Sequence, residues 1–337
     1  MLPRSPKRPP TPFGDYLLLD RAGVGGMAEV WRAKMFGAEG QGRLVALKRI
    51  LPTFAEDEEF MTMFLDEAKL GIQLLHTNIA QTFEQGQIGP LLYLSQEYVP
   101  GKSLSEIFKH SRETGWTMPI HLVCACITGM CEGLDYAHRK KDARGRDLNI
   151  IHRGLSLADV LVSYEGDVKV IDFGIAKAEG RITHTQPGII KGKFGYLSPE
   201  QLDGLPLDRR SDVFAIGVCL YELLTGQRLF DAETPLEAVE KLRKAKVTPP
   251  SVHNRRIPKA LERIVLRALA PDVSERYLYA SELSDDLRHF LAQHADSGPQ
   301  LDLRRYLRVT FAEDLRIEEE RRKEYAQIEP PKDFDLC

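Results

Sequence analysis

The spacing of apolar residues divides the chain into a strand-rich first part and a helix-rich second part. Between residues 13 and 50, short alternating runs are separated by glycines, which predicts strands joined by tight turns. Residues 56–75 carry apolar side chains at helical spacing, and residues 89–99 return to a strand pattern. The first part therefore predicts a small antiparallel sheet with one main helix.

Beyond residue 101 the apolar positions recur mainly at helical spacing. Long helices are predicted over 118–140 and 211–226, with Ser211 as the N-cap of the second and Gly226 just past its end. Further helical stretches are predicted at 235–244, 257–269 and 280–292. The pattern thus predicts an α+β fold with two unequal lobes and a hinge near residues 97–101.

The two ends of the sequence differ from this body. Residues 1–12 are proline-rich and basic, which predicts a disordered arm. Residues 293–337 are highly charged, and a stripe at four-residue spacing predicts a helix that docks either on the main body or on a partner. The predicted divisions are an arm (1–12), a first lobe (13–97), a hinge and second lobe (98–292) and an extension (293–337), and the stripe comprises Leu303, Leu307, Phe311 and Leu315.

Composition narrows the function classes. The 337 residues carry a formal net charge of only −3, which argues against nucleic acid or an anionic membrane as the partner. The five cysteines show no paired spacing, so reduced thiols in a cytoplasmic protein are expected. Cys124, Cys126 and Cys131 are expected to be buried apolar residues, with a metal site as the alternative. No apolar run reaches about 18 residues, so no membrane span is expected.

A glycine cluster, "GVGGMAEV", lies between two predicted strands. Gly23, Gly25 and Gly26 would allow the backbone to approach a phosphate group closely. The same residues would also serve an ordinary hairpin turn, so this cluster alone does not establish a nucleotide site.

Two charged residues are expected on inward-facing positions. Ala46 and Lys48 are two apart and so share one strand face, while Glu67 lies within the apolar stripe of the predicted helix. An ion pair between Lys48 and Glu67 would offset the cost of burying the carboxylate, and the alternative is a lysine that reaches solvent. Asp172 ends a predicted strand beside a glycine, a suitable place for a Mg²⁺ ligand.

Read in order, these motifs resemble a eukaryotic-type Ser/Thr protein kinase. The resemblance spans residues 13–292. Further motifs that support it, in order along the chain, are "IIHRGLSLADVLV", "VIDFG", "GYLSPEQ" and "SDVFAIG". Three segments are similar in sequence to the Ser/Thr kinases of myxobacteria and their relatives: "GVGGMAEVWRA", "ARGRDLN" and "KGKFGYLSPEQ". The resemblance implies the bilobal kinase fold, with a sheet-containing N-lobe and a mainly helical C-lobe, and binding of ATP with Mg²⁺.

The resemblance also implies roles for individual residues. Lys48, positioned by Glu67, would hold the α- and β-phosphates beneath the glycine cluster. The adenine would lie between Val30 and Ala46 on one side and Leu161 on the other. The backbone groups of Glu97 and Val99 would meet its edge, with Gln96 at the gatekeeper position.

Outside the nucleotide pocket, the implied roles concern the metal, the activation loop and the framework. Asp172 and Asp159 would bind Mg²⁺. Arg153 would meet a phosphorylated activation loop, with Thr183 or Thr185 as the modified residue, and the alternative is an unmodified flexible loop. His152, Glu200, Asp212 and Arg276 would be structural.

The catalytic loop departs from the family pattern His-Arg-Asp-Leu-Lys-Pro-x-Asn. The aspartate that accepts the substrate proton is replaced by Gly154, the lysine by Ser156, and the metal-binding asparagine by Asp159. Serine at this lysine position also occurs in myxobacterial relatives that keep the aspartate. Glycine has no side chain that could orient or deprotonate a hydroxyl group, so the catalytic centre is incomplete.

The sequence therefore predicts a nucleotide-binding pseudokinase that regulates or scaffolds signalling proteins, such as an active kinase. Three alternatives remain open. The first is a slow but genuine Ser/Thr kinase, which is feasible because phosphoryl transfer depends mostly on positioning and electrostatics. The second is a scaffold with an empty cleft, and the third is a decayed gene product. Decay is disfavoured by the retention of Lys48, Glu67, Asp172, Glu200, Asp212 and Arg276.

Overall fold

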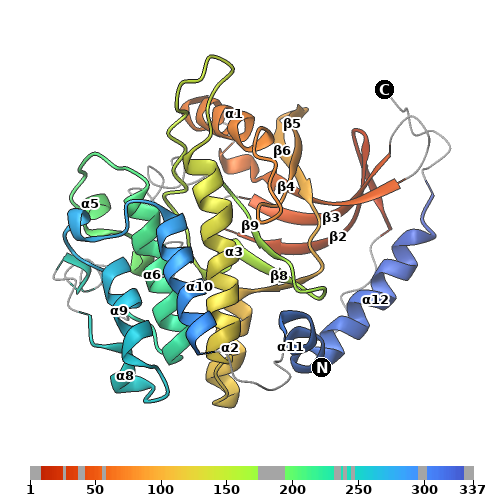
Figure 1. Cartoon of the computed structure of the whole chain (residues 1–337). Coiled ribbons are helices and arrows are strands. Elements are labelled where there is room, and N and C mark those ends of the chain that lie inside the picture. Colours follow the sequence, from red (N-terminus) through yellow and green to blue (C-terminus); the bar gives the residue numbers. More distant parts are fainter. Residues whose placement is uncertain are drawn as a thin grey trace. The chain divides into compact units, whose positions relative to one another are not determined.

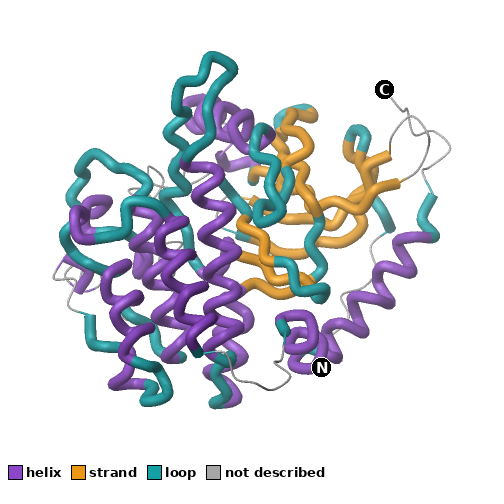
Figure 2. The backbone as a smooth tube through the Cα atoms, viewed as in Figure 1, coloured by secondary structure: helices purple, strands orange, loops and turns teal. Residues whose placement is uncertain are grey.

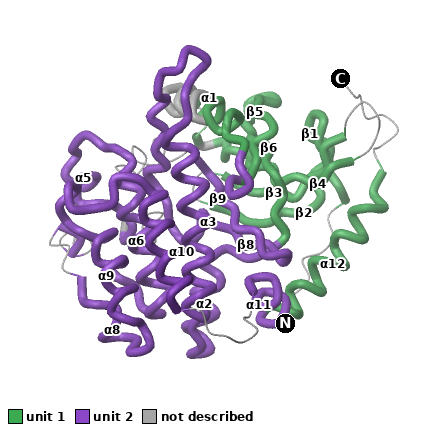
Figure 3. Tube along the Cα trace, in the orientation of Figure 1, with its two compact units in different colours: residues 1–75, 80–100, 311–337 green, residues 76–79, 101–310 purple. Residues whose placement is uncertain are grey.

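The structure, a computed structural model, describes residues 9–25, 28–36, 42–54, 58–173, 194–230, 237, 241–243, 247–294 and 302–329. The chain divides into two compact units, coloured separately in Figure 3. Unit 1 combines residues 1–75, 80–100 and 311–337, and unit 2 combines residues 76–79 and 101–310. The predicted extension is divided between the units, because residues 293–310 belong to unit 2 and residues 311–337 to unit 1.

Unit 1 is built on a six-stranded antiparallel sheet with the strand order β1-β2-β3-β4-β6-β5 (Figure 1). Its buried core includes Tyr16, Leu18, Val45 and Leu47, whose alternation along β2 and β4 follows the predicted two-residue period. The elements of this unit are β1 Thr11–Phe13, β2 Tyr16–Val24, β3 Ala28–Phe36, β4 Gly42–Ile50, η1 Pro52–Phe54, α1 Glu58–Ile72, β5 Thr82–Ile88, β6 Leu91–Glu97 and α12 Ala312–Ala326.

The first strand begins inside the segment that the sequence predicts to be a disordered arm. Thr11 and Pro12 pair with Leu18 and Leu17 of β2, so the prediction of disorder was wrong for these two residues. Proline is compatible with this position because β1 is an edge strand, where one side of the backbone needs no ladder partner. Residues 1–8 lie outside the described residues.

Unit 2 contains most of the helices and a three-stranded antiparallel sheet, β7-β8-β9, as the purple and orange segments of Figure 2 show. Its strands are β7 Gly101–Ser103, β8 Val160–Ser163 and β9 Val168–Val170. Its helices are α2 Leu104–Thr114, α3 Ile120–His138, η2 Leu157–Asp159, η3 Phe194–Tyr196, α5 Pro199–Leu202, α6 Arg210–Thr225, α8 Pro250–His253, α9 Lys259–Ala268, η4 Val273–Glu275, α10 Ala280–Gln293 and α11 Leu303–Thr310.

Helices α3 and α6 form the buried centre of unit 2. Helix α3 packs against α6, α10 and β9, and it carries Cys124, Cys126 and Cys131, which are all fully buried. Burial raises the pKa of the Cys124 thiol to about 12, so it remains protonated. These cysteines are free thiols that pack as small apolar residues, as predicted. Within the described ranges, no helix is long and apolar enough to cross a membrane.

Of the two predicted ends of α6, the C-terminal end is confirmed and the N-terminal cap is not. Gly226 is the C-cap in the left-handed conformation with φ 70°, as predicted. The prediction of Ser211 as the N-cap was wrong, because the helix starts at Arg210 after Arg209. The Ser211 hydroxyl is buried and donates to Glu200, so a tertiary partner replaces the local capping contact.

The C-terminal extension is helical, as predicted. Leu307 on α11 and Phe311 just before α12 are buried, while Leu303 and Leu315 of the same stripe are half-buried. Helix α11 contacts β8 within unit 2, where Arg304 and Arg308 both pair with Glu165. The stripe therefore docks on this chain's own body.

We predict that Gly101→Ala lowers the free energy of unfolding by about 1–3 kcal/mol. A Cβ at this position would lie 2.0 Å from the carbonyl oxygen of Val162, so the β7–β8 pair would have to shift. Gly195→Ala is the matched control, because its Cβ would meet its nearest neighbour at 3.6 Å, an ordinary contact. Chemical denaturation of both variants checks the prediction, and equal stability of the two would contradict it.

Candidate functional site: a loop anchored by Asp212

The carboxylate of Asp212 anchors the loop that carries the motif His152-Arg153-Gly154. This aspartate lies in the first turn of α6 and is 1% exposed. Its Oδ2 accepts hydrogen bonds from the backbone N–H of His152 (2.8 Å) and from Nε2 of His138 (2.7 Å). Its Oδ1 accepts from the backbone N–H of Arg153 (2.9 Å). One side chain therefore fixes two consecutive peptide groups of the loop.

Asp212 remains ionised although it is buried. Burial alone would raise its pKa, but the hydrogen bond and charge of His138, together with the contacts from His152, outweigh that effect and lower the pKa. A buried carboxylate that accepts several N–H groups is strongly destabilising to remove, because its donors then lose their partners.

The backbone at Arg153 is held in an uncommon conformation. Arg153 has φ 66°, and the N–H of Gly154 donates to the carbonyl oxygen of His152 (2.8 Å), which closes a γ-turn. Nε2 of Gln201 donates to the Arg153 carbonyl (2.6 Å), and Nε2 of His152 donates to the Ile171 carbonyl (3.0 Å). Such a backbone costs about 1–3 kcal/mol, and these contacts maintain it.

Gly154 follows directly after this turn and is half-buried. It is not among the described glycines with a positive φ, so its backbone does not require glycine. Position 154 therefore has a backbone conformation open to other residues, and its glycine contributes no side chain.

Ser156 and Asp159 form a buried pair. The Ser156 hydroxyl donates to Oδ2 of Asp159 (2.6 Å), and both residues are 3% exposed. Ser156 is also the N-cap of η2, because its Oγ accepts from the Ala158 N–H (3.3 Å). Ser156 thus orients the Asp159 carboxylate, a contact that the sequence analysis did not foresee.

The two predicted metal ligands come from adjacent segments of unit 2. The Ile171 N–H donates to the backbone carbonyl of Asp159 (2.9 Å), which places Asp172 on the neighbouring strand end, with φ 63°. Carboxylate oxygens suit Mg²⁺, which usually takes one or two protein carboxylates and completes its coordination with phosphate and water. Within the described residues, no group of three or more His, Cys, Asp or Glu side chains forms a metal site. Asp159 and Asp172 supply the ligand type and number that Mg²⁺ usually takes from a protein when phosphates provide the other ligands.

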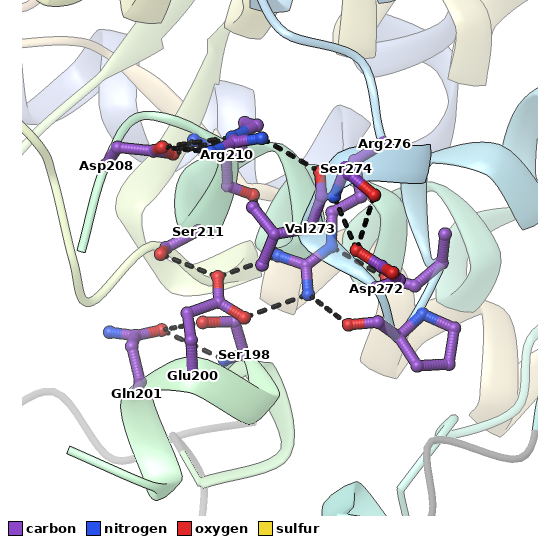
Figure 4. Close-up of polar contacts among 12 residues, drawn as sticks. Ser198, Glu200, Gln201, Asp208, Arg210, Ser211, Asp272, Val273, Ser274 and Arg276 are labelled. Atoms are coloured by element: carbon purple, nitrogen blue, oxygen red, sulfur yellow. Dashed lines mark hydrogen bonds and ion pairs between the residues drawn. The ribbon is translucent and has the colours of Figure 1, made fainter. Parts of the chain in front are cut away.

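A second buried ion pair stabilises the neighbouring part of unit 2 (Figure 4). Two guanidinium nitrogens of Arg276 contact the two oxygens of Glu200 at 2.7 and 2.9 Å, and the Ser211 hydroxyl donates to the same carboxylate (2.7 Å). Burial would raise the pKa of Glu200, but Arg276 and Ser211 outweigh it, and the pKa is lowered. The remaining Arg276 donors bond to backbone carbonyls, so the buried charge is well satisfied.

The predicted nucleotide-facing residues of unit 1 share one face of its sheet. Val30 lies opposite Lys48, and Ala46 alternates with the buried core residues Val45 and Leu47. Gly23 pairs with Val30, and the Gly25 N–H closes the turn onto the Ala28 carbonyl (2.8 Å).

The hinge candidates follow on β6. The Glu97 N–H donates to the Gln81 carbonyl (2.8 Å), and Gln96 donates to the Thr82 hydroxyl (3.2 Å). Val99 follows the strand, and Leu161 lies on β8 in unit 2, opposite Ser103. Gly26, Thr183, Thr185 and the side chain of Glu67 lie outside the described residues, so the predicted Lys48–Glu67 pair stays a prediction.

Two contributors to the loop were missed from sequence. Gln201 had a recognisable signal, because Ser198 and Gln201 form the capping box of α5. The tertiary bond from Gln201 to Arg153 has no such signal. His138 is an isolated histidine at the end of α3, and only the fold brings it to Asp212.

We predict that Asp212→Asn lowers the free energy of unfolding by about 3 kcal/mol at neutral pH. The difference from the unmodified chain should shrink as the pH falls. The folded-state pKa is lowered, so the stabilising effect is complete above the unfolded pKa of about 3.9 and is lost as the pH falls through the folded pKa.

Asp208→Asn is the control, because Asp208 is partly exposed and pairs with Arg210 at the surface. Its effect should be at most about 1 kcal/mol. Denaturation at several pH values distinguishes the two variants. A pH-independent effect of Asp212→Asn, or an equal effect of both substitutions, would argue against the anchoring role.

Comparison with known proteins identifies the class. The family model described as "Protein kinase domain" matches residues 16–287. The chain is 37% identical over 310 residues to the tyrosine-protein kinase MasK of Myxococcus xanthus, covering 92% of this chain and 48% of that protein. It is 34% identical over 297 residues to the serine/threonine-protein kinase PknB of Mycobacterium leprae, covering 87% of this chain and 45% of that protein. This chain spans about half the length of these relatives.

The fold comparison agrees. The crystal structure of the Mycobacterium tuberculosis PknI kinase domain matches with a TM-score of 0.63 and 24% identity, covering 83% of this chain and 97% of that chain. The antiparallel sheet of unit 1 and the helices of unit 2 are those of the protein kinase fold. On the matched domain and these relatives, the chain belongs to the protein kinase family.

Proposed function

We propose that this protein is a nucleotide-binding pseudokinase, which binds ATP with Mg²⁺ and regulates or scaffolds partner signalling proteins. Phosphoryl transfer would be absent or strongly reduced. The observation that carries the proposal is Gly154, which supplies no side chain in a loop whose backbone is otherwise firmly anchored.

The loop geometry supports the proposal that phosphoryl transfer is lost while the loop backbone keeps its structure. Asp212 and Gln201 still hold the turn at Arg153, so position 154 keeps a defined backbone. A positioned general base typically contributes about 10²–10⁴-fold to a rate. Starting from about 1–100 turnovers per second for an ordinary kinase, its loss leaves about 10⁻⁴ to 1 per second.

The metal-facing carboxylates support retained nucleotide binding. Asp159 ends η2 and Asp172 follows β9, the Ile171 N–H joins these two segments, and Ser156 orients the Asp159 carboxylate. Without a cation, two nearby carboxylates repel each other, so Mg²⁺ delivered with the phosphates would relieve that repulsion. In this proposal the bound nucleotide stabilises one arrangement of the protein that partners recognise.

A slow but genuine protein kinase is the second candidate. The anchored loop backbone favours it, because phosphoryl transfer depends mainly on positioning and electrostatics. The relatives are named as Ser/Thr and tyrosine kinases. A radiolabelled-ATP assay with Asp172→Ala as the control separates the candidates, since a signal that this substitution abolishes indicates a real enzyme.

We predict that ATP with Mg²⁺ raises the thermal stability of the unmodified chain. At a ligand concentration of 100 times the dissociation constant, the stabilisation is about 2.7 kcal/mol. Lys48→Ala and Asp172→Ala should each reduce the shift, since they remove the predicted phosphate and metal contacts. A thermal-shift titration measures this, and an unchanged melting temperature in the unmodified chain would contradict nucleotide binding.

We predict that Gly154→Asp increases phosphoryl transfer by about 10²-fold, the lower end of the range for a positioned base. The backbone at this position has no positive φ that would disfavour a side chain. Gly154→Asn is the matched control, because it has the same shape but is a far weaker proton acceptor. Equal gains for the two variants, or no gain for aspartate in a folded protein, would count against the vacancy at position 154 as the cause of inactivity.

A further inference from the structure

Glu318 is a buried carboxylate on a helix that is otherwise largely exposed. It is 6% exposed, whereas the adjacent Ile317 is 40% exposed and Glu319 and Glu320 are also exposed. A charged side chain is rarely buried unless it is paired. Its partners therefore indicate what α12 is positioned to do.

One partner of Glu318 is Tyr98. The Tyr98 hydroxyl donates to Oε1 of Glu318 (2.6 Å) and accepts from Nε of Arg32 (2.9 Å). The Arg32 guanidinium also lies 5.7 Å from the centre of the Tyr98 ring. Burial raises the pKa of Tyr98 to about 12, so at neutral pH the hydroxyl keeps the proton that it donates.

These contacts close into a ring of five residues within unit 1. Arg32 pairs with Asp20 at 3.1 Å, Arg321 contacts Asp20 at 3.4 Å, and Arg321 also pairs with Glu318 at 2.9 Å. Two residues of the ring lie on α12, two on the sheet and one on the segment after β6. We call these residues, Asp20, Arg32, Tyr98, Glu318 and Arg321, the hinge ring.

A second set of contacts fastens the end of α12 to the same sheet. Tyr325 packs in a buried cluster with Leu17, Leu19 and Phe36. Lys34 is 7% exposed, and its Nζ donates to the Ile328 carbonyl (2.7 Å), just beyond the helix end. A cation at this position also complements the partial negative charge of a helix C-terminus. Docking of α12 therefore does not depend on the hinge ring alone.

The hinge ring includes neighbours of both groups of unit 1 residues that the resemblance to protein kinases assigns to the adenine. Tyr98 lies between Glu97 and Val99, whose backbone groups are the proposed edge contacts. Arg32 is the cross-strand partner of Ala46, which is one of the proposed covering residues. Docking of α12 and the position of these groups are thus linked through two side chains.

From this arrangement we propose that α12 is an intramolecular clamp on the hinge, and that its docking through Glu318 and Tyr98 increases nucleotide affinity. The proposal rests on the proposed nucleotide binding. The docked helix holds Tyr98 in place, so the adjacent Glu97 and Val99 backbone is ordered before nucleotide arrives. A binding site that is ordered in advance avoids the entropic cost of ordering during binding.

The clamp also offers a route for regulation. A partner that draws α12 off the sheet would leave the Tyr98 hydroxyl without its acceptor Glu318 and Asp20 without Arg321, loosen the hinge and release nucleotide. By linkage, bound nucleotide would hold α12 more firmly on the sheet and make it less available to such a partner.

The test uses the full chain and the variants Glu318→Gln, Tyr98→Phe and Glu320→Gln. The last is the matched control, because it removes the same charge from an exposed surface pair with Arg316 on the same helix. Amide hydrogen exchange of residues 97–99 and of α12 is measured without nucleotide, with the β3 and β4 amides as the internal check of folding. ATP–Mg²⁺ affinity is then measured by calorimetry on the same samples.

The clamp predicts faster exchange at residues 97–99 in Glu318→Gln and Tyr98→Phe, together with about a tenfold weaker nucleotide affinity, the scale of one hydrogen bond to a charged group. Glu320→Gln should change neither. Unchanged hinge exchange overturns the clamp, and faster exchange with equal or tighter affinity overturns its effect on binding. If the unmodified chain binds no nucleotide, the proposed function and the affinity effect fail, while hinge exchange still decides whether α12 holds the hinge.

Discussion

One buried carboxylate, that of Asp212, fixes the loop that carries Gly154. It accepts the N–H groups of two consecutive loop residues, His152 and Arg153, and it takes a third bond from His138. Because the acceptor is buried and ionised, the loop cannot move away without leaving a charge and several donors unsatisfied. The positive φ of Arg153 is maintained on this foundation. Position 154 is therefore defined by its surroundings, whatever residue occupies it.

Because of this constraint, the loop can keep the backbone structure of a kinase even where the residue for phosphoryl transfer is lost. In this chain the supports of the loop are present, yet the residue they would present is Gly154. The same separation holds at the next two altered positions, where Ser156 and Asp159 satisfy each other in the protein interior. A loop that had simply decayed would not be expected to retain the contacts of Asp212 and Gln201 with its backbone. The proposed regulatory role follows from this combination of a preserved framework and a missing base.

Local patterns allowed much of the fold to be predicted, but not the contacts between distant segments. The two-residue period of β4 placed Ala46 and Lys48 on one face, and Gly226 marked the end of α6. The same reasoning failed at Ser211, where a local capping preference gave way to a tertiary bond with Glu200. The extension was predicted as a docking helix from its apolar stripe, but the polar contact of Glu318 with Tyr98 had no periodic signal, because it joins residues far apart in sequence.

The most direct test of the central claim is the phosphoryl-transfer rate of the purified, unmodified chain at saturating ATP and Mg²⁺, with occupancy of the nucleotide site measured on the same sample. We expect a nucleotide site that fills, with turnover below about 1 per second, because position 154 offers no proton acceptor. Turnover within the ordinary kinase range of about 1–100 per second would contradict it.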